Sequence, residues 1–150
     1  MMITCYLRRG IVYIPTVARR ATSPIYTNIE PIAVIPLEDL DAVRQALRES
    51  LKKGNPIIPD PDPQELRAPP IILKYAGVRS LSAFFRSTST WSIRDDDGLF
   101  KITVYRKHPK GYWEPDPSQE IKFPQGTTVD NVIDRMMAIL QETARAEAKP

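Results

Sequence analysis

The side chains best suited to chemistry are scarce in this 150-residue chain, which has one histidine, His108, and one cysteine, Cys5. Metal centres, thiol chemistry and acid–base relays draw mainly on these two residue types. The glycine-rich phosphate-binding motifs GxGxxG and GxxxxGK[ST] are absent, as are HExxH, CxxC and GxSxG. The sequence therefore favours a protein that binds a partner over an enzyme, and it predicts no cofactor and no metal site.

An acidic cluster is formed by Asp95, Asp96 and Asp97, followed by Gly98. Clustered carboxylates can bind a divalent cation, but the spacing does not match the calcium-loop pattern D-x-[DN]-x-[DN]-G. Asp-Gly is also the usual composition of a tight hairpin turn, because both residues tolerate positive φ. We interpret the cluster as a turn with an acidic tip that could contact a partner.

A basic and aromatic segment spans residues 105–113. Its cations could neutralise phosphates and its rings could stack on the bases of single-stranded nucleic acid. In the alternative interpretation, Tyr112 and Trp113 close a proline-rich loop over the core, and His108 is a surface group beside three cations. Together with the acidic tip, the candidate partner-binding residues here are Arg106, Lys107, His108, Lys110, Tyr112 and Trp113. Arg79, Arg86 and Arg94 could flank the same face.

Composition indicates a soluble globular protein, with 42% hydrophobic and 26% charged residues. The net charge is +3 and the signs are interleaved along the chain, which is a weak signature for nucleic-acid binding. No apolar run approaches the roughly 20 residues that cross a bilayer. The start of the chain lacks the features of a secretory signal, and a lone cysteine suits a reducing compartment. We expect a cytoplasmic protein with a single domain over residues 1–150.

The first third of the chain reads as strands. Residues 2–7 and 11–17 flank Arg8-Arg9-Gly10, which predicts a hairpin, and residues 25–35 supply a third extended segment. Pro15 cannot donate to a ladder, so the second strand should lie at a sheet edge or carry a bulge there.

A helix follows, with Glu38 and Asp39 in its first turn, Leu40, Val43, Leu47 and Leu51 on one stripe, and Gly54 as its C-terminal cap. Residues 55–70 contain too many prolines for regular structure. We expect this segment to be an extended strap that is docked on the surface by Ile57 and Ile58.

The second half repeats this organisation. A short helix that begins after Ser80 should bury Leu81, Phe84 and Phe85, and Asp97-Gly98 should join the two strands of a hairpin. The predicted elements are a strand at 71–75, a helix at 81–86, strands at 90–94, 99–106 and 120–123, and a helix at 129–146 capped by Thr128.

The whole pattern predicts the α+β class, with an antiparallel sheet arranged as one or two meanders. Two main amphipathic helices and one short helix should pack on it. Each half places strands before an apolar-Pro step and an amphipathic helix. A duplicated ββ(β)α unit, with halves 1–54 and 71–146 joined by the strap 55–70, is one interpretation of this pattern.

Five segments, which together span most of the chain, carry a resemblance to a known group of proteins: ITCYLRRGIVYIPT (3–16), GNPIIP (54–59), LKYAGVRSLSAFFRSTSTWSI (73–93), LFKITVYRKHPKGYW (99–113) and FPQGTTVDNVIDRMMAIL (123–140). They resemble small proteobacterial proteins, some of which are associated with contact-dependent growth inhibition systems as immunity proteins. The resemblance implies a cytoplasmic protein that binds and neutralises a toxin domain, often a nuclease, and that needs no reactive residues.

Charge complementarity bears on this implication. An inhibitor of a basic nuclease groove should be acidic at the contact, so the Asp95–Asp97 tip or the acidic residues between Asp60 and Glu65 would have to supply it. Two alternatives stay open: a nucleic-acid-binding module built on residues 105–113, and an enzyme whose carboxylates converge with His108 from distant segments.

Overall fold

One mainly antiparallel sheet runs through the chain, and the computed structural model describes residues 1–149 of it; Pro150, which the predicted domain includes, lies outside the described residues. The strand order is β3-β2-β1-β5-β6-β7, with β4 paired to β2 and β8 paired to β6. Only the two-residue β2–β4 pairing is parallel among those described. The predicted α+β class is confirmed. The strands are β1 (Met2–Arg8), β2 (Ile11–Arg20), β3 (Tyr26–Pro36), β4 (Ile57–Ile58), β5 (Thr88–Asp96), β6 (Leu99–Lys107), β7 (Trp113–Pro115) and β8 (Ile121–Lys122).

The two predicted hairpins are both present. Arg9 and Gly10, with φ of 49° and 77°, turn β1 into β2, and Asp97 and Gly98 turn β5 into β6. The β2–β3 register shifts between Pro15 and Thr16. This irregularity confirms the bulge at Pro15, within a strand that has neighbours on both sides.

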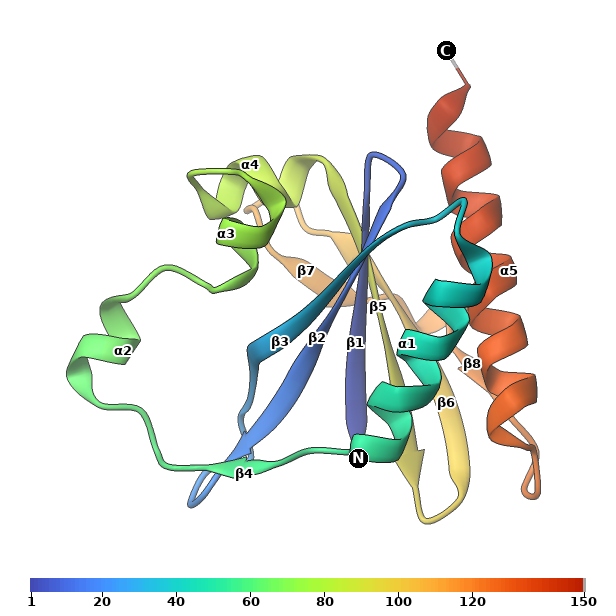
Figure 1. The fold of residues 1–150 in the computed structure, drawn as a ribbon, viewed down its shortest axis with the longest axis horizontal. Coiled ribbons are helices and arrows are strands. Elements are labelled where there is room, and N and C mark those ends of the chain that lie inside the picture. Colours follow the sequence, from blue (N-terminus) through green and yellow to red (C-terminus); the bar gives the residue numbers. More distant parts are fainter. Residues whose placement is uncertain (150) are drawn as a thin grey trace.

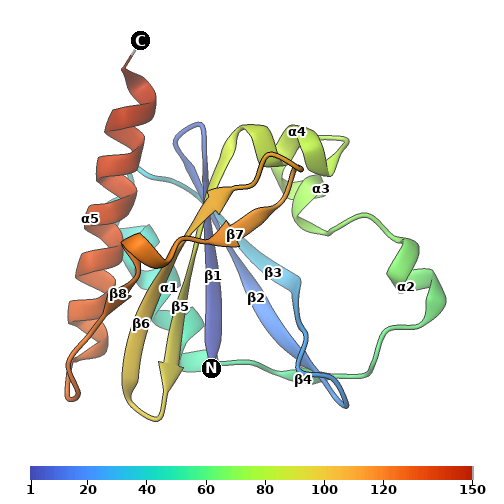
Figure 2. The ribbon, with the colours of Figure 1, turned by 180° about the vertical axis from the view of Figure 1, so that it is seen from behind.

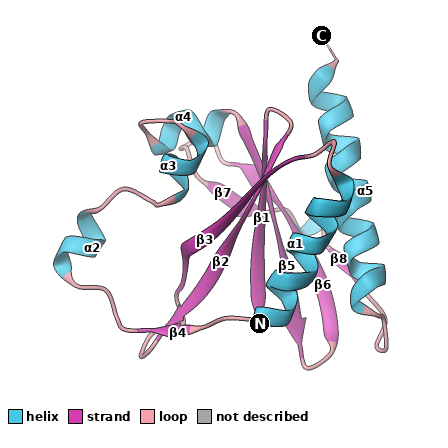
Figure 3. Cartoon of the chain, viewed as in Figure 1, coloured by secondary structure: helices cyan, strands magenta, loops and turns pink. Residues whose placement is uncertain are grey.

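Alternation along β1 gives the sheet two faces with different covers. Ile3, Cys5 and Leu7 point to the first face, which is covered by helices α1 (Leu40–Lys53) and α5 (Val129–Ala148) (Figure 1). Figure 3 shows α1 in front of the strands, with α5 next to it on the right. Burial of their apolar stripes forms the main core, which holds Val43, Leu47, Leu51, Val132, Ile133, Met136, Met137 and Leu140.

Local capping explains where these helices begin and end. The Asp39 carboxylate accepts the Ala42 N–H and begins α1, and Gly54, at φ 69°, donates to the Ser50 carbonyl at its end. The Thr128 hydroxyl accepts the Asn131 N–H and begins α5. Both predicted amphipathic helices are confirmed, including the Gly54 and Thr128 caps.

The second face is covered at one end by two short helices, α3 (Ile72–Ala76) and α4 (Leu81–Arg86) (Figure 2). Phe84 and Leu73 pack there against Tyr13 of β2 and Ile32 of β3. The predicted helix at 81–86 is therefore confirmed with its Ser80 cap, but Leu81 is 48% exposed and its predicted burial is wrong.

The predicted strand at 71–75 is wrong, because these residues form α3. Apolar and β-branched residues favoured a strand by propensity. The segment instead follows Pro69-Pro70 and ends at Gly77, which has φ 68° and donates to the Leu73 and Lys74 carbonyls. One helical turn places Ile72 and Leu73 together against β3, and this tertiary packing overrides the strand propensity.

The proline-rich strap, residues 55–70, contains β4 and a short helix α2 (Pro63–Arg67). The prediction that this segment lacks regular structure is therefore wrong. Its docking at Ile57 and Ile58 is confirmed in part: both residues pair with β2 and Ile58 is half-buried, but Ile57 is 72% exposed. Polar contacts also fix the strap. The buried Arg20 guanidinium donates to the Pro59 carbonyl (2.8 Å) and pairs with Glu65 (3.2 Å).

A central ladder joins the two halves of the chain. β1 and β5 pair antiparallel over seven residue pairs, from Met2 and Arg94 to Arg8 and Thr88. Each half then contributes one helix to the first face (Figure 1). The interpretation of the halves as a duplicated unit stays a prediction.

Candidate partner-binding surfaces

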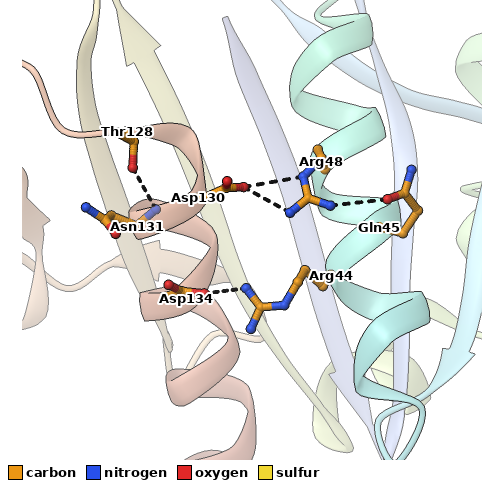
Figure 4. A network of polar contacts seen from close by, with 7 residues as sticks. All are labelled: Arg44, Gln45, Arg48, Thr128, Asp130, Asn131 and Asp134. Carbon is orange, nitrogen blue, oxygen red and sulfur yellow. Dashed lines mark hydrogen bonds and ion pairs between the residues drawn. The ribbon is translucent and has the colours of Figure 1, made fainter.

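The outer side of the α1–α5 layer carries a set of cross-helix ion pairs, drawn in Figure 4. Arg44 of α1 pairs with Asp134 of α5, and Arg48 pairs with Asp130 at 2.9 Å. Gln45 Oε1 accepts a further hydrogen bond from Arg48 Nη1. Pairs this exposed are each worth less than about 1 kcal/mol, but here they neutralise facing charges. We therefore regard this surface as a seam between two helices.

The acidic tip is a tight turn whose geometry accounts for its composition. Asp97 and Gly98 have φ of 54° and 86°, and the Gly98 N–H donates to Asp95 Oδ1 at 2.8 Å. Asp96 pairs with Leu99 at the end of the hairpin. In residues 1–149, no three His, Cys, Asp or Glu side chains gather as a metal ion would require. Asp96 and Asp97 remain exposed.

The basic and aromatic segment lies at the opposite end of the same hairpin (Figure 2). β6 runs for nine residues between them, which separates the two predicted surfaces by roughly 27 Å. The predicted candidate residues therefore form two separate surfaces. Arg94, near the acidic tip on β5, faces Lys101 in the ladder and does not join the basic segment.

Arg106 is committed to local ion pairs. Its Nε lies 2.9 Å from Glu114 and its Nη1 lies 3.6 Å from Asp116. Hydrogen bonds from the side chains of Ser118 and Gln119 are the main reason that the pKa of Asp116 is lowered, and Arg106 adds to the effect. The Arg106 charge is thereby neutralised within the protein.

Trp113 packs inward as part of an aromatic cluster. Its ring centroid lies 4.9 Å from that of Phe85, 6.0 Å from Phe84 and 6.2 Å from Tyr6. The interpretation in which Trp113 closes a loop over the core is confirmed. Because its rings are occupied by these neighbours, Trp113 does not offer a free face for a base.

Tyr112 and His108 stack on each other in the loop that follows β6. Their ring centroids lie 4.4 Å apart at 8°, and Tyr112 is 50% exposed, so its predicted packing over the core is wrong. His108 Nδ1 accepts the Lys110 N–H at 3.0 Å, and the His108 N–H donates to the Tyr112 carbonyl at 2.7 Å. These contacts hold His108 as a structural loop residue.

Lys107 connects this loop to helix α4. Its Nζ donates to the Arg86 carbonyl (2.8 Å) and lies 5.6 Å from the Phe85 ring centroid. Partial burial lowers the pKa of Lys107, and nearby Glu147 partly offsets the effect. Arg8 reaches the same region, where its Nε donates to Ser87 Oγ at 2.8 Å and its Nη1 to the Ala76 carbonyl at 3.4 Å.

Two stretches of sequence without carboxylates are thereby brought together. Residues 66–94 and 98–113 contain no Asp or Glu. We call their exposed cations around α3, α4 and the 107–112 loop the basic end: Lys74, Arg79, Arg86, Lys107 and Lys110. The sequence analysis expected Arg79 and Arg86 to flank the 105–113 segment and missed Lys74, although the long stretch without carboxylates was a signal for all three.

The strap leaves an apolar groove beside β3. The groove has a volume of about 560 Å³ and is lined by Ile29, Ile58, Leu66 and Ile72, with Arg20 at its polar side. Ile25 and Leu66 are largely exposed nearby. No helix within residues 1–149 is long and apolar enough to cross a membrane.

Comparison with known proteins gives matches in structure alone. No protein-family model matches the chain, and no curated protein matches its sequence. A protein of unknown function, NMB0488 from Neisseria meningitidis, superposes with a TM-score of 0.62 at 14% identity, covering 99% of this chain and 94% of that one. A chain of the CdiA-CT/CdiI toxin and immunity complex from Yersinia pseudotuberculosis superposes with a TM-score of 0.61 at 10% identity, with 95% of each chain covered. These likenesses establish the fold, and at that level the resemblance to immunity proteins of contact-dependent growth inhibition is confirmed.

Proposed function

We propose that this chain is a non-catalytic cytoplasmic binding protein that neutralises a toxin domain, as an immunity protein does. The observation that carries the proposal is the fold likeness to a toxin and immunity complex, which extends over 95% of the chain. Because the likeness covers nearly the whole chain, it concerns the complete architecture of sheet and helices. Fold likeness alone does not define function, so the side chains must agree with it.

The reactive side chains agree with a binding role. Cys5 is buried in the main core, and burial raises its pKa to about 12, so its thiol is not a nucleophile at neutral pH. His108 is held by its stacking partner Tyr112 and by the Lys110 N–H. The alternative of an enzyme built on His108 therefore lacks a positioned acid–base pair among the described residues.

The nucleic-acid alternative loses two of its predicted contacts. Trp113 packs against Phe84 and Phe85, and Arg106 is paired with Glu114 and Asp116. Tyr112 retains one exposed ring face at most, because the other stacks on His108. With Tyr112 as its exposed ring, the predicted 105–113 segment offers little base stacking, which is a main source of affinity for single strands.

The proposal is tested by capture followed by a growth assay. The tagged chain is used to capture proteins from lysates of its own species, with washes at low and high salt, and bound proteins are identified by mass spectrometry. We expect one protein domain that survives high salt, that arrests bacterial growth when expressed alone, and that permits growth when co-expressed with this chain. A growth-arresting domain unaffected by co-expression, or nucleic acid that is released by salt as the sole captured material, would contradict the proposal.

A further inference from the structure

We propose that the basic end (Lys74, Arg79, Arg86, Lys107 and Lys110) is the surface on which this chain docks an acidic protein partner. The inference rests on the proposed function for the nature of the partner, and it adds the location and the charge of the contact. It differs from the expectation drawn from the sequence, in which the acidic tip would contact a basic toxin.

Unpaired charge is the first support. None of the five cations forms an ion pair within residues 1–149, whereas Arg44 and Arg48 on the helix layer, and Arg106 next to the basic end, are each matched by a carboxylate. Two carboxylates lie at the margins of the basic end: Glu147, which acts on Lys107 over a distance and accepts a hydrogen bond from Ser89, and Glu30, whose hydrogen bond with Tyr75 of α3 raises the pKa of that phenol. A concentration of one sign of charge speeds the approach of a surface of the opposite sign.

Rigidity is the second support. The Lys107 ammonium is fixed to the Arg86 carbonyl above the Phe85 ring, and Phe85 packs on Trp113. Arg8 ties the end of α3 to the residue that follows α4. Backbone that is already ordered loses little entropy on binding, so a larger share of the electrostatic attraction appears as affinity.

The accessible chemistry favours carboxylates over bases. At this end Tyr112 is the one aromatic side chain among the exposed large hydrophobic residues, and it stacks on His108. Phe84 and Phe85 are buried, with the Lys107 ammonium over the Phe85 ring. Ammonium and guanidinium groups bind carboxylates directly through charge-assisted hydrogen bonds, which require no stacking surface. The surface therefore fits an acidic protein better than single-stranded nucleic acid.

A defined acidic peptide tests the inference without knowledge of the partner. The ¹⁵N-labelled full chain is titrated with an acetylated hexaglutamate peptide, and amide shifts are mapped by NMR. We expect saturable shifts in α4 and in the 107–112 loop. The variant R79E/R86E/K110E should weaken binding by about tenfold or more, because three exposed charges are reversed.

A matched variant controls for net charge. Arg19, Lys52 and Arg67 are also exposed, and R19E/K52E/R67E changes the net charge equally while leaving the basic end intact. We expect its affinity for the peptide to stay within about twofold of the wild type, because the three reversed charges are distant from the basic end and are screened by salt. Circular dichroism and thermal unfolding should show both variants folded, since all six side chains are exposed.

Three results would overturn the inference. The first is the absence of saturable shifts, and the second is an equal loss of affinity in the two variants. The third is a single-stranded oligouridine that binds the basic end more tightly than the peptide does, which would assign the surface to nucleic acid.

A toxin domain from the capture experiment separates the two proposals. If R79E/R86E/K110E neutralises that domain as well as wild type, the inference fails and the proposed function stands; if the peptide maps as expected and no domain is neutralised, the proposed function fails.

Discussion

Truncation of Trp113 distinguishes a structural role from a ligand-binding role for the aromatic segment. Trp113→Ala removes a ring whose centroid lies within 6.2 Å of three other aromatic rings. Large aromatic to alanine changes in cores cost about 3–5 kcal/mol, and aromatic pairs contribute about 1 kcal/mol each beyond buried area. Because Trp113 is half-buried, we expect a loss of about 2–4 kcal/mol in the free energy of unfolding.

Trp113→Phe should behave very differently. The indole Nε1 is buried and has no hydrogen-bond partner within the described residues. A phenyl ring keeps much of the packing on Phe84 and Phe85 and removes a donor that costs free energy when it is buried unpaired. We therefore expect Trp113→Phe to lie within about 1 kcal/mol of the wild type.

Urea unfolding at equilibrium measures both variants, with far-UV circular dichroism as the probe. Trp91, which is 3% exposed in the main core, supplies a second probe by fluorescence. Tyr112→Ala is the matched control, because it truncates the neighbouring exposed ring and should cost less than about 0.5 kcal/mol. If Trp113→Ala is as stable as Tyr112→Ala, or Trp113→Phe is as damaging as Trp113→Ala, the packing argument is refuted.

Four further outcomes are expected. Cys5 should be inert to a thiol reagent in the native state and react on unfolding. The free energy of unfolding should fall above about pH 9, because the thiol of the unfolded chain ionises there while burial holds the native pKa near 12. Equilibrium unfolding at pH 7 and pH 10 measures this fall. Asp116→Asn should reduce the loss of stability at acid pH. Because the native pKa of Asp116 is lowered, its carboxylate stabilises the fold above the unfolded carboxyl pKa of about 4, and this stabilisation is lost as the pH falls through the native pKa. Equal losses of stability at acid pH in wild type and variant would contradict this. Replacement of Asp95–Asp97 by asparagine should change stability by less than about 0.5 kcal/mol, because asparagine still offers Oδ1 to the Gly98 N–H, and a larger loss in thermal unfolding would assign a role to the charges. Arg44→Ala should cost less than about 1 kcal/mol at low salt and less still at high salt, as expected for an exposed pair with Asp134; a loss that is insensitive to salt would point to packing instead.

Local sequence signals predicted the elements whose structure is decided locally. The stripe of Val43, Leu47 and Leu51 with its Gly54 cap, and the Asp97-Gly98 turn, each combine periodicity with a terminating residue. Such signals agree with the tertiary structure, so the helices and hairpins could be read directly. The central β1–β5 pairing could not, because no local pattern specifies which of several strands meet.

The errors lie where tertiary contacts outweigh composition. Residues 71–75 have strand propensity, yet one helical turn lets Ile72 and Leu73 pack together on β3. Ile57 is apolar but exposed, because Arg20 binds the strap through the Pro59 carbonyl and Glu65. A sequence pattern predicts that apolar residues are buried, but it does not predict which carbonyl and carboxylate groups a buried arginine binds.

The candidate surface was predicted in pieces. Lys107 and Lys110 stood out because they lie among aromatic residues, while Arg86 stood 21 positions away from Lys107. Their proximity depends on the β5–β6 register and on the packing of Phe85 against Trp113. The residue types thus indicated a positively charged surface, and the fold determines which of these cations lie next to one another.

The central ladder has a consequence for how the chain reaches its native state. β2 with β3, and β5 with β6, are joined by short connections and can form soon after folding begins. β1 and β5 pair residues that lie about 80 to 90 positions apart, so their ladder closes only after a long loop has been brought together. Pairing between residues so far apart slows folding, and we expect the β1–β5 ladder to form after the local hairpins. Before it forms, β1 and β5 would each present an unpaired edge, and we expect the newly made chain to be most prone to aggregate at that stage.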